Sequence, residues 1–230
     1  VELMDRPALR SVEDKPGMPS FLKGLSDDAA ALLVETRASD PQTLLRQIEE
    51  LIDLLTGIPT VFPITFMDKP EDYNKLWNIR KGLFPSVGGA RRIGTTVVIE
   101  DVVFPIEKLS EGTLELQALM QKHGYPEGII FGHALEGNLH FVFCPDLTNP
   151  EKTRSYKALL DEVCEMVVRK YDGSLKGAHG TGRNMAPFVE LEWGNQAYTY
   201  MRRLKKAFDP DNILNPGVII NDNPNVYIEN

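Results

Sequence analysis

The chain has 230 residues, 42% of them hydrophobic, which is typical of a globular protein with one substantial core, alone or with a small appendage. Its formal net charge of -8 leaves no broad basic field, and this argues against nucleic acid as a partner. Cys144 and Cys164 are the two cysteines, so we expect no disulfide framework, a reducing compartment and a cytoplasmic protein.

The ends of the chain are expected to be linkers. Residues 1–28 hold Pro7, Pro16 and Pro19 among charged residues, and residues 221–230 read "NDNPNVYIEN". The sequence therefore predicts one domain over residues 29–220, which begins with a strand near residue 30.

Apolar periodicity predicts alternating strands and helices between these ends. Asp40, Pro41 and the apolar spacing that follows predict a helix with a capped start. The expected elements are a strand at 30–38, a helix at 40–57, a strand at 61–67, a helix at 70–84, a strand at 95–104, a helix at 106–124, a hairpin at 128–144, a helix at 149–173, a glycine loop at 173–184 and a helix at 187–207. This order predicts an α+β fold in which helices cover a mainly antiparallel sheet.

The hairpin "GIIFGHALEGNLHFVFC" carries two histidines. A turn centred on Glu136 and Gly137 would place His133 directly opposite His140, where both imidazoles could bind one divalent ion. A turn centred on Gly137 and Asn138 would move the histidines out of register. The alternative to a metal site is a pair of half-buried histidines bonded to backbone carbonyls.

Other candidate residues lie in two glycine-rich stretches. His179, in "GAHGTGR", could serve as a base or a ligand because a loop exposes its imidazole. Arg80, Arg91 and Arg92 could bind a substrate carboxylate, although ordinary surface charge is the alternative. The stretch "GTGR" lacks the spacing of a phosphate-binding loop, which argues against nucleotide binding by this chain alone.

Three motifs in order, "GHALEGNLHF", "GSLKGAHGTG" and "FDPDNILNPG", resemble the C-terminal substrate lobe of FAD-linked oxidases of the vanillyl-alcohol oxidase type. The branch is that of the D-lactate, glycolate and D-2-hydroxyglutarate dehydrogenases, and the likeness is strongest to large bacterial D-2-hydroxyglutarate dehydrogenases. The resemblance implies an α+β lobe with ferredoxin-like elements. It also implies an FAD-binding domain in the same polypeptide, a 4Fe–4S domain in the parent protein and an isolated lobe without activity.

The resemblance also implies roles for individual residues. His133 and His140 match ligands of zinc or manganese, and His179 matches the base that takes the proton of the substrate hydroxyl. Arg80 matches a substrate-carboxylate ligand. Asn138 is a further substrate-binding candidate, and Asn215 is a minor cofactor-binding candidate.

The sequence departs from the family pattern at the expected third metal ligand. Ala178 stands where a glutamate is usual, and Val142 replaces a polar residue. Either Glu190 or Glu192 supplies the missing carboxylate, or the metal binds weakly, or Ala178 is an engineered replacement of the natural residue.

A second departure concerns the substrate carboxylate. Ile99 stands where a lysine is common, two residues before Asp101. Arg91 or Arg92 would then take over this contact.

The leading hypothesis is the substrate lobe of a flavin-dependent dehydrogenase acting on a D-2-hydroxy acid of the D-2-hydroxyglutarate or D-lactate type. A stand-alone zinc hydrolase and a non-catalytic ligand-binding domain are the alternatives. The electron acceptor stays open, and the parent protein could associate peripherally with the inner membrane.

Overall fold

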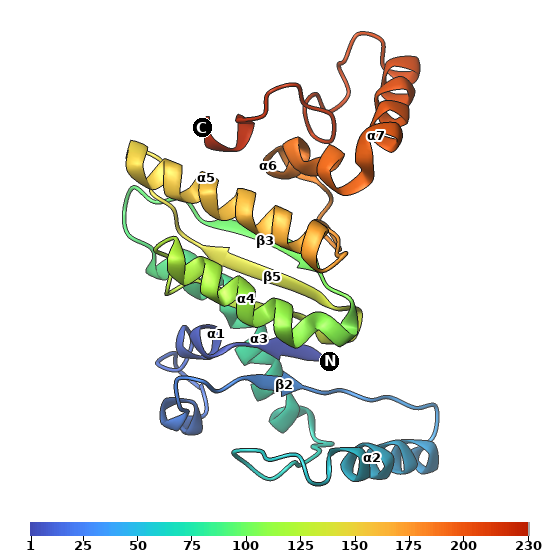
Figure 1. The fold of residues 1–230 in the computed structure, drawn as a ribbon. Helices are drawn as coiled ribbons and strands as arrows, with labels where there is room; N and C mark the ends of the chain where they lie inside the picture. Colours follow the sequence, from blue (N-terminus) through green and yellow to red (C-terminus); the bar gives the residue numbers. More distant parts are fainter. Residues whose placement is uncertain (230) are drawn as a thin grey trace.

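The computed structural model describes residues 1–229, and a five-stranded antiparallel sheet organises them (Figure 1). The order across the sheet is β2-β1-β4-β5-β3. The strands are β1 (Glu2–Met4), β2 (Ala31–Leu33), β3 (Val98–Val103), β4 (Ile129–His133) and β5 (Asn138–Phe143). The predicted α+β class with an antiparallel sheet is confirmed.

The helices are α1 (Arg6–Arg10), α2 (Pro41–Leu55), α3 (Pro70–Ala90), α4 (Leu109–Lys122), α5 (Pro150–Glu165), α6 (Gly182–Met185) and α7 (Val189–Phe208). Helix α2 begins as predicted, because the Asp40 side chain accepts a hydrogen bond from the Thr43 amide at 2.8 Å. No helix within residues 1–229 has both the length and the apolar character that a membrane crossing requires.

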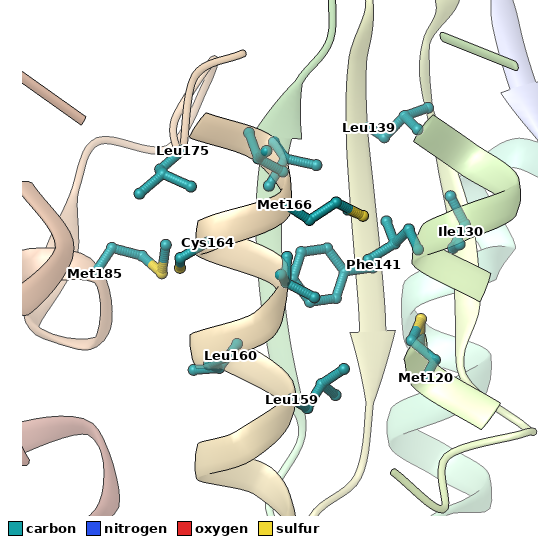
Figure 2. Packing of buried hydrophobic residues seen from close by; sticks show 14 of the residues in the cluster. Met120, Ile130, Leu139, Phe141, Leu159, Leu160, Cys164, Met166, Leu175 and Met185 are labelled. Carbon is teal, nitrogen blue, oxygen red and sulfur yellow. The ribbon is translucent and has the colours of Figure 1, made fainter. Parts of the chain in front are cut away.

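The two faces of the sheet are covered by different helices. Helices α4 and α5 cover one face, where Met120, Phe141 and Leu159 pack in a common layer (Figure 2). Helices α1 and α3 cover part of the other face, with Leu83 packed in the same cluster as Phe131. Because side chains alternate along a strand, β5 directs Phe141 to the first face and its even-numbered residues to the second.

The prediction that residues 1–28 form a linker is wrong. Strand β1 pairs with both β2 and β4, and Met4, Leu9 and Leu22 are buried in the core. The prolines misled the prediction, since Pro7 stands in the first turn of α1, a position where a missing N–H costs nothing.

The predicted C-terminal linker is also wrong for the part that the structure describes. Tyr227 is 1% exposed and packs against Tyr156 and Phe188 of the main core. Residues 221–229 therefore belong to the folded unit.

The predicted strand at 61–67 does not form. This segment is a loop, in which Val61 and Phe62 are exposed. Pro63 lacks the N–H that a strand would offer to a neighbour, so the apolar run by itself does not make a ladder.

The buried carboxylate of Asp5 makes the stability of the fold depend on pH. This carboxylate caps α1, accepting from the Ala8 amide at 2.8 Å, and burial raises the pKa of Asp5 from 3.8 to about 6. The folded state then binds the proton more tightly than the unfolded state, so stability falls as pH rises from about 4 to about 6. This shift corresponds to about 3 kcal/mol. Asp5→Asn keeps a capping oxygen without the charge.

We expect Asp5→Asn to raise the free energy of unfolding at pH 7.5 by about 2 kcal/mol and to flatten its pH dependence, measured by urea unfolding at pH 4.5 and 7.5. Asp5→Ala is the control, because it loses the cap and destabilises the protein at pH 4.5 as well. A lower stability of Asp5→Asn than of the natural protein at pH 7.5 would contradict the argument.

Candidate active site

The histidine hairpin has a register that differs from both predicted ones. His133 pairs with Asn138, and His140 pairs with Phe131. The connection spans residues 134–137 and ends at Gly137, whose φ of +65° suits glycine. A two-residue turn would have required a left-handed conformation at Glu136, which a glutamate disfavours.

The observed register is shifted by two residues from the one that would pair His133 with His140. A shift of two residues keeps both histidines on the same face of the sheet, as predicted. His133 and His140 are now diagonal neighbours, with ring centroids 5.3 Å apart and the ring planes nearly perpendicular. Asp101 of β3 lies opposite His140 on the other side of β5. The face that α1 and α3 leave open thus carries a cluster of histidines and carboxylates.

Glu2 is a functional candidate that the sequence does not reveal, because it lies in the segment predicted to be a linker. Its carboxylate accepts from Arg80 Nε at 2.5 Å and lies 2.7 Å from His133 Nδ1. Burial alone would raise the pKa of Glu2, but the hydrogen bonds with Arg80 and His133 outweigh burial and lower it. Because Nδ1 of His133 contacts Glu2, Nε2 is the ring nitrogen that a ligand can reach.

Arg80 lies beside His133, since both side chains contact the Glu2 carboxylate. Its guanidinium carbon lies 4.4 Å from the ring centroid of Phe131, and its side chain is 16% exposed. Only Nε is bound to Glu2, so the terminal nitrogens can meet a ligand.

Asp101 is the second missed candidate. It is 0% exposed and accepts hydrogen bonds from the amides of Gly177 at 2.8 Å and Ala178 at 2.7 Å. Asn138 Nδ2 and Lys176 Nζ also donate to it, each at 3.1 Å. Burial by itself would raise the pKa of Asp101, but the Ala178 amide and the Lys176 ammonium outweigh burial and lower it. The signal in the sequence is a pair of acidic residues, Glu100 and Asp101, inside the apolar run "VVIEDVVF".

His179 follows directly after the two amides that Asp101 holds. It has a φ of +62°, a left-handed conformation that costs energy for a residue other than glycine. Its ring stacks on that of His140 with centroids 4.8 Å apart, and its side chain stays 48% exposed. Asp101, His140 and His179 each offer a ligand atom within 4.8 Å of the others.

His140 is the buried member of the cluster. It is 3% exposed, and its Nδ1 has no hydrogen-bond partner within residues 1–229. Burial and the neighbouring His179 lower the pKa of His140 to about 4, so the ring is neutral near pH 7. A neutral imidazole with an unused nitrogen has the chemistry of a metal ligand.

A groove of about 630 Å³ lies beside this cluster, lined by His133, Glu2, Glu136, Asn138 and Ala178 among others. The predicted substrate residue Asn138 lines the groove, although its amide nitrogen is bound to Asp101 and to the Val102 carbonyl. A second cavity, of about 300 Å³, lies between the glycine loop and α7.

The structure does not bring Arg91 and Arg92 to the cluster. Both are exposed and follow the end of α3. Arg91 donates to the carbonyl of Gly88, in the last turn of α3, and to that of Thr95. The predicted transfer of the carboxylate contact from position 99 to these arginines therefore has no geometric support.

Glu190 and Glu192 are not ligands of the histidine pair in this structure. Glu190 accepts from Asn195, and Glu192 accepts from the Ser174 hydroxyl and the Leu175 amide. Asp101, rather than either glutamate, is the carboxylate beside His140.

Asn215 lies in the exposed loop after α7. Asp209 shapes this loop by accepting from the amides of Ile213 and Leu214. Nothing within the described residues places Asn215 against the histidine cluster.

Residues 1–219 match the family model described as FAD linked oxidases, C-terminal domain. The chain belongs to this family. It is 33% identical over 193 residues to a D-2-hydroxyglutarate dehydrogenase of Pantoea ananatis, covering 81% of this chain and 19% of that protein. It is 28% identical to the glycolate oxidase subunit GlcD of Bacillus subtilis, covering 94% of this chain and 44% of that one.

A mitochondrial D-lactate dehydrogenase (cytochrome) of Arabidopsis thaliana is 27% identical, over 96% of this chain and 37% of the relative. The chain thus spans less than half the length of these relatives. Among solved structures, a 4-ethylphenol oxidase of Gulosibacter chungangensis in complex with isoeugenol has the same fold, with a TM-score of 0.56 at 14% identity, over 96% of this chain and 47% of that one.

The hydrogen bonds that hold the glycine loop to Asp101 can be tested without any ligand. We expect Asp101→Asn to raise the hydrogen-exchange rates of the Gly177 and Ala178 amides about tenfold, because two charge-assisted hydrogen bonds become neutral ones. Asp146→Asn, at an exposed acceptor of Thr148, is the matched control and should leave these amides unchanged. Equal exchange in all three proteins would show that Asp101 does not hold the loop.

Proposed function

We propose that the natural protein containing this chain is a flavin-dependent dehydrogenase that oxidises a D-2-hydroxy acid to the 2-oxo acid, with this chain as its substrate lobe. Membership of the FAD-linked family supports the flavin. The observation that carries the proposal is His179, held in a left-handed conformation after two anchored amides and stacked on His140.

In this reaction the α-carbon gives up a hydride, the hydroxyl gives up a proton, and a carbon–oxygen double bond forms. FAD, when bound, supplies the acceptor for the hydride. His179 takes the hydroxyl proton on a ring nitrogen, because its imidazole is 48% exposed while it stacks on His140. Arg80 binds the substrate carboxylate through the nitrogens that Glu2 leaves free, and Phe131 holds the guanidinium in place.

We also propose that His133 and His140 hold a divalent ion, zinc or manganese. The unused Nδ1 of His140 and the free Nε2 of His133 fit such a role. A bound ion would lower the pKa of the substrate hydroxyl. Both oxygens of Asp101 already accept hydrogen bonds, so the chain offers an incomplete ligand set without a carboxylate at position 178.

Membership of the FAD-linked oxidase family favours the dehydrogenase over a stand-alone hydrolase, and Glu190 and Glu192 are engaged elsewhere. The 4Fe–4S cluster, a cytoplasmic location and a peripheral contact with the inner membrane stay predictions for the natural protein. The FAD-binding domain of the same polypeptide is its proposed partner.

The natural protein, purified with its flavin, should lose flavin absorbance when mixed anaerobically with D-2-hydroxy acids and not with the L-enantiomers. His179→Gln should slow this reduction about 10²- to 10⁴-fold, the usual contribution of a positioned base. His123→Gln is the control, because His123 ends α4 on the opposite side of the sheet. Reduction by L-acids alone, or by no 2-hydroxy acid, would contradict the proposal.

Metal analysis tests the histidine pair separately. We expect His133→Ala and His140→Ala each to weaken zinc binding, measured by competition with a chromogenic chelator. Ala178→Glu should strengthen it at least about tenfold by adding a charged ligand. Zinc affinity that is equal in all these variants would remove the metal from the proposal.

A further inference from the structure

We infer that Glu100 is a positioning residue for His179, because its buried carboxylate holds together the two ends of the loop that carries this histidine. The inference rests on the proposed function and deepens it: it names a group that acts on the proposed base without touching the substrate. It comes from side-chain contacts of β3 that the proposed reaction leaves unused.

The loop starts at the edge of the sheet. Strand β3 is the last strand in the order β2-β1-β4-β5-β3, and Ser174 pairs with it through two backbone hydrogen bonds to Val103, at 2.8 and 3.0 Å. From there the chain passes through His179 and enters α6 at Gly182. The segment that carries His179 thus departs from the outer edge of β3.

Glu100 bridges the two ends of this segment. Its Oε2 accepts a hydrogen bond from the ammonium group of Lys176, three residues before His179. Its Oε1 accepts from Nδ2 of Asn184, five residues after His179, at 3.1 Å. One carboxylate is therefore bonded to both sides of residues 177–183 and fixes how far apart these sides lie.

The carboxylate of Glu100 can act in this way because it is buried. Glu100 is 4% exposed and the Lys176 side chain is 14% exposed, so water competes little for the bond between them. A buried carboxylate that lost a donor would keep part of its charge unsatisfied, which is costly. The need of Glu100 for both donors therefore resists opening of the loop.

Glu100 and Asp101 act on different parts of the loop. Asp101 accepts from the two amides directly before His179. After His179, the next side-chain hydrogen bond to the sheet within residues 1–229 is that of Asn184 to Glu100. The residues between them include two glycines with positive φ, which have no side chain to stiffen the backbone. The exit from the loop is thus held by Glu100, as its entry is held by Asp101.

The position of His179 decides whether its ring can take the hydroxyl proton. A displacement of about 1 Å at a reacting group can cost about 10²-fold in rate. Release of Asn184 from Glu100 should therefore slow proton transfer. Binding of the substrate carboxylate should stay constant, because Arg80 lies on α3 and makes no contact with this loop in the part of the chain that the structure describes.

The test changes Asn184, because its replacement leaves the buried pair of Glu100 and Lys176 intact. Asn184→Asp keeps the shape of the side chain but places a carboxylate against Glu100. On the natural protein with its flavin, we expect the limiting rate of anaerobic flavin reduction to fall at least about tenfold. The acid used is whichever of D-lactate and D-2-hydroxyglutarate reduces the flavin faster. Its concentration at half the limiting rate should change less than about twofold.

A double variant separates positioning from general damage. Glu100→Gln combined with Asn184→Asp reverses the roles: the glutamine NH₂ group donates to the aspartate, and the glutamine oxygen still accepts from Lys176. We expect the limiting rate to recover to within about threefold of that of the unaltered protein. Asn195→Asp is the matched control, because Asn195 donates to Glu190 at 2.8 Å at an exposed site of α7, and it should leave reduction unchanged.

Hydrogen exchange gives a measurement without turnover. Residues 180–183 should exchange about tenfold faster in Asn184→Asp and regain their protection in the double variant. Met185 is 3% exposed, so α6 should keep its place in both proteins. Asn184→Ala, which removes the hydrogen bond without adding a charge, replaces Asn184→Asp in these comparisons if the charged variant does not fold.

The outcomes separate the two proposals. Unchanged reduction and exchange in Asn184→Asp would overturn the inference and leave the dehydrogenase standing. A double variant as slow as Asn184→Asp, or an equal loss of rate and of apparent affinity, would also overturn it. Failure of every D-2-hydroxy acid to reduce the flavin of the unaltered protein would overturn the proposed function together with the inference.

Discussion

The candidate site depends on one buried carboxylate. Asp101 is 0% exposed, and a buried anion is tolerable only when donors surround it. The required donors come from β5 and from the glycine loop, through Asn138 Nδ2, Lys176 Nζ and the amides of Gly177 and Ala178. The hydrogen bonds that the buried Asp101 carboxylate requires therefore fix the loop to the sheet. The position of His179 follows from this attachment.

The other side of the cluster is organised by a second carboxylate. Glu2 connects Arg80 of α3 to His133 of β4, so a residue from the first strand aligns two side chains from distant parts of the chain. The imidazole of His140 is kept neutral between these two anionic centres by its burial. The cluster thus combines one neutral, buried imidazole, that of His140, with two carboxylates whose oxygens already accept hydrogen bonds.

The sequence predicts features that depend only on residues close to one another in the chain. The cap at Asp40 predicted the start of α2, and alternation along the hairpin predicted the common face of His133 and His140. The register was not readable, because distant segments fix the turn: the Phe104 amide donates to the Gly137 carbonyl. The same holds for Glu2, since a three-residue strand becomes recognisable only beside its partners.

Ala178 shows how the site separates two functions. Its contribution to the loop is the backbone amide that donates to Asp101, and any residue other than proline supplies this group. Loss of a carboxylate at position 178 therefore removes a potential metal ligand without releasing the loop. The placement of His179 and the affinity for a metal ion are consequently independent properties, and the first can persist in a chain in which the second is weak.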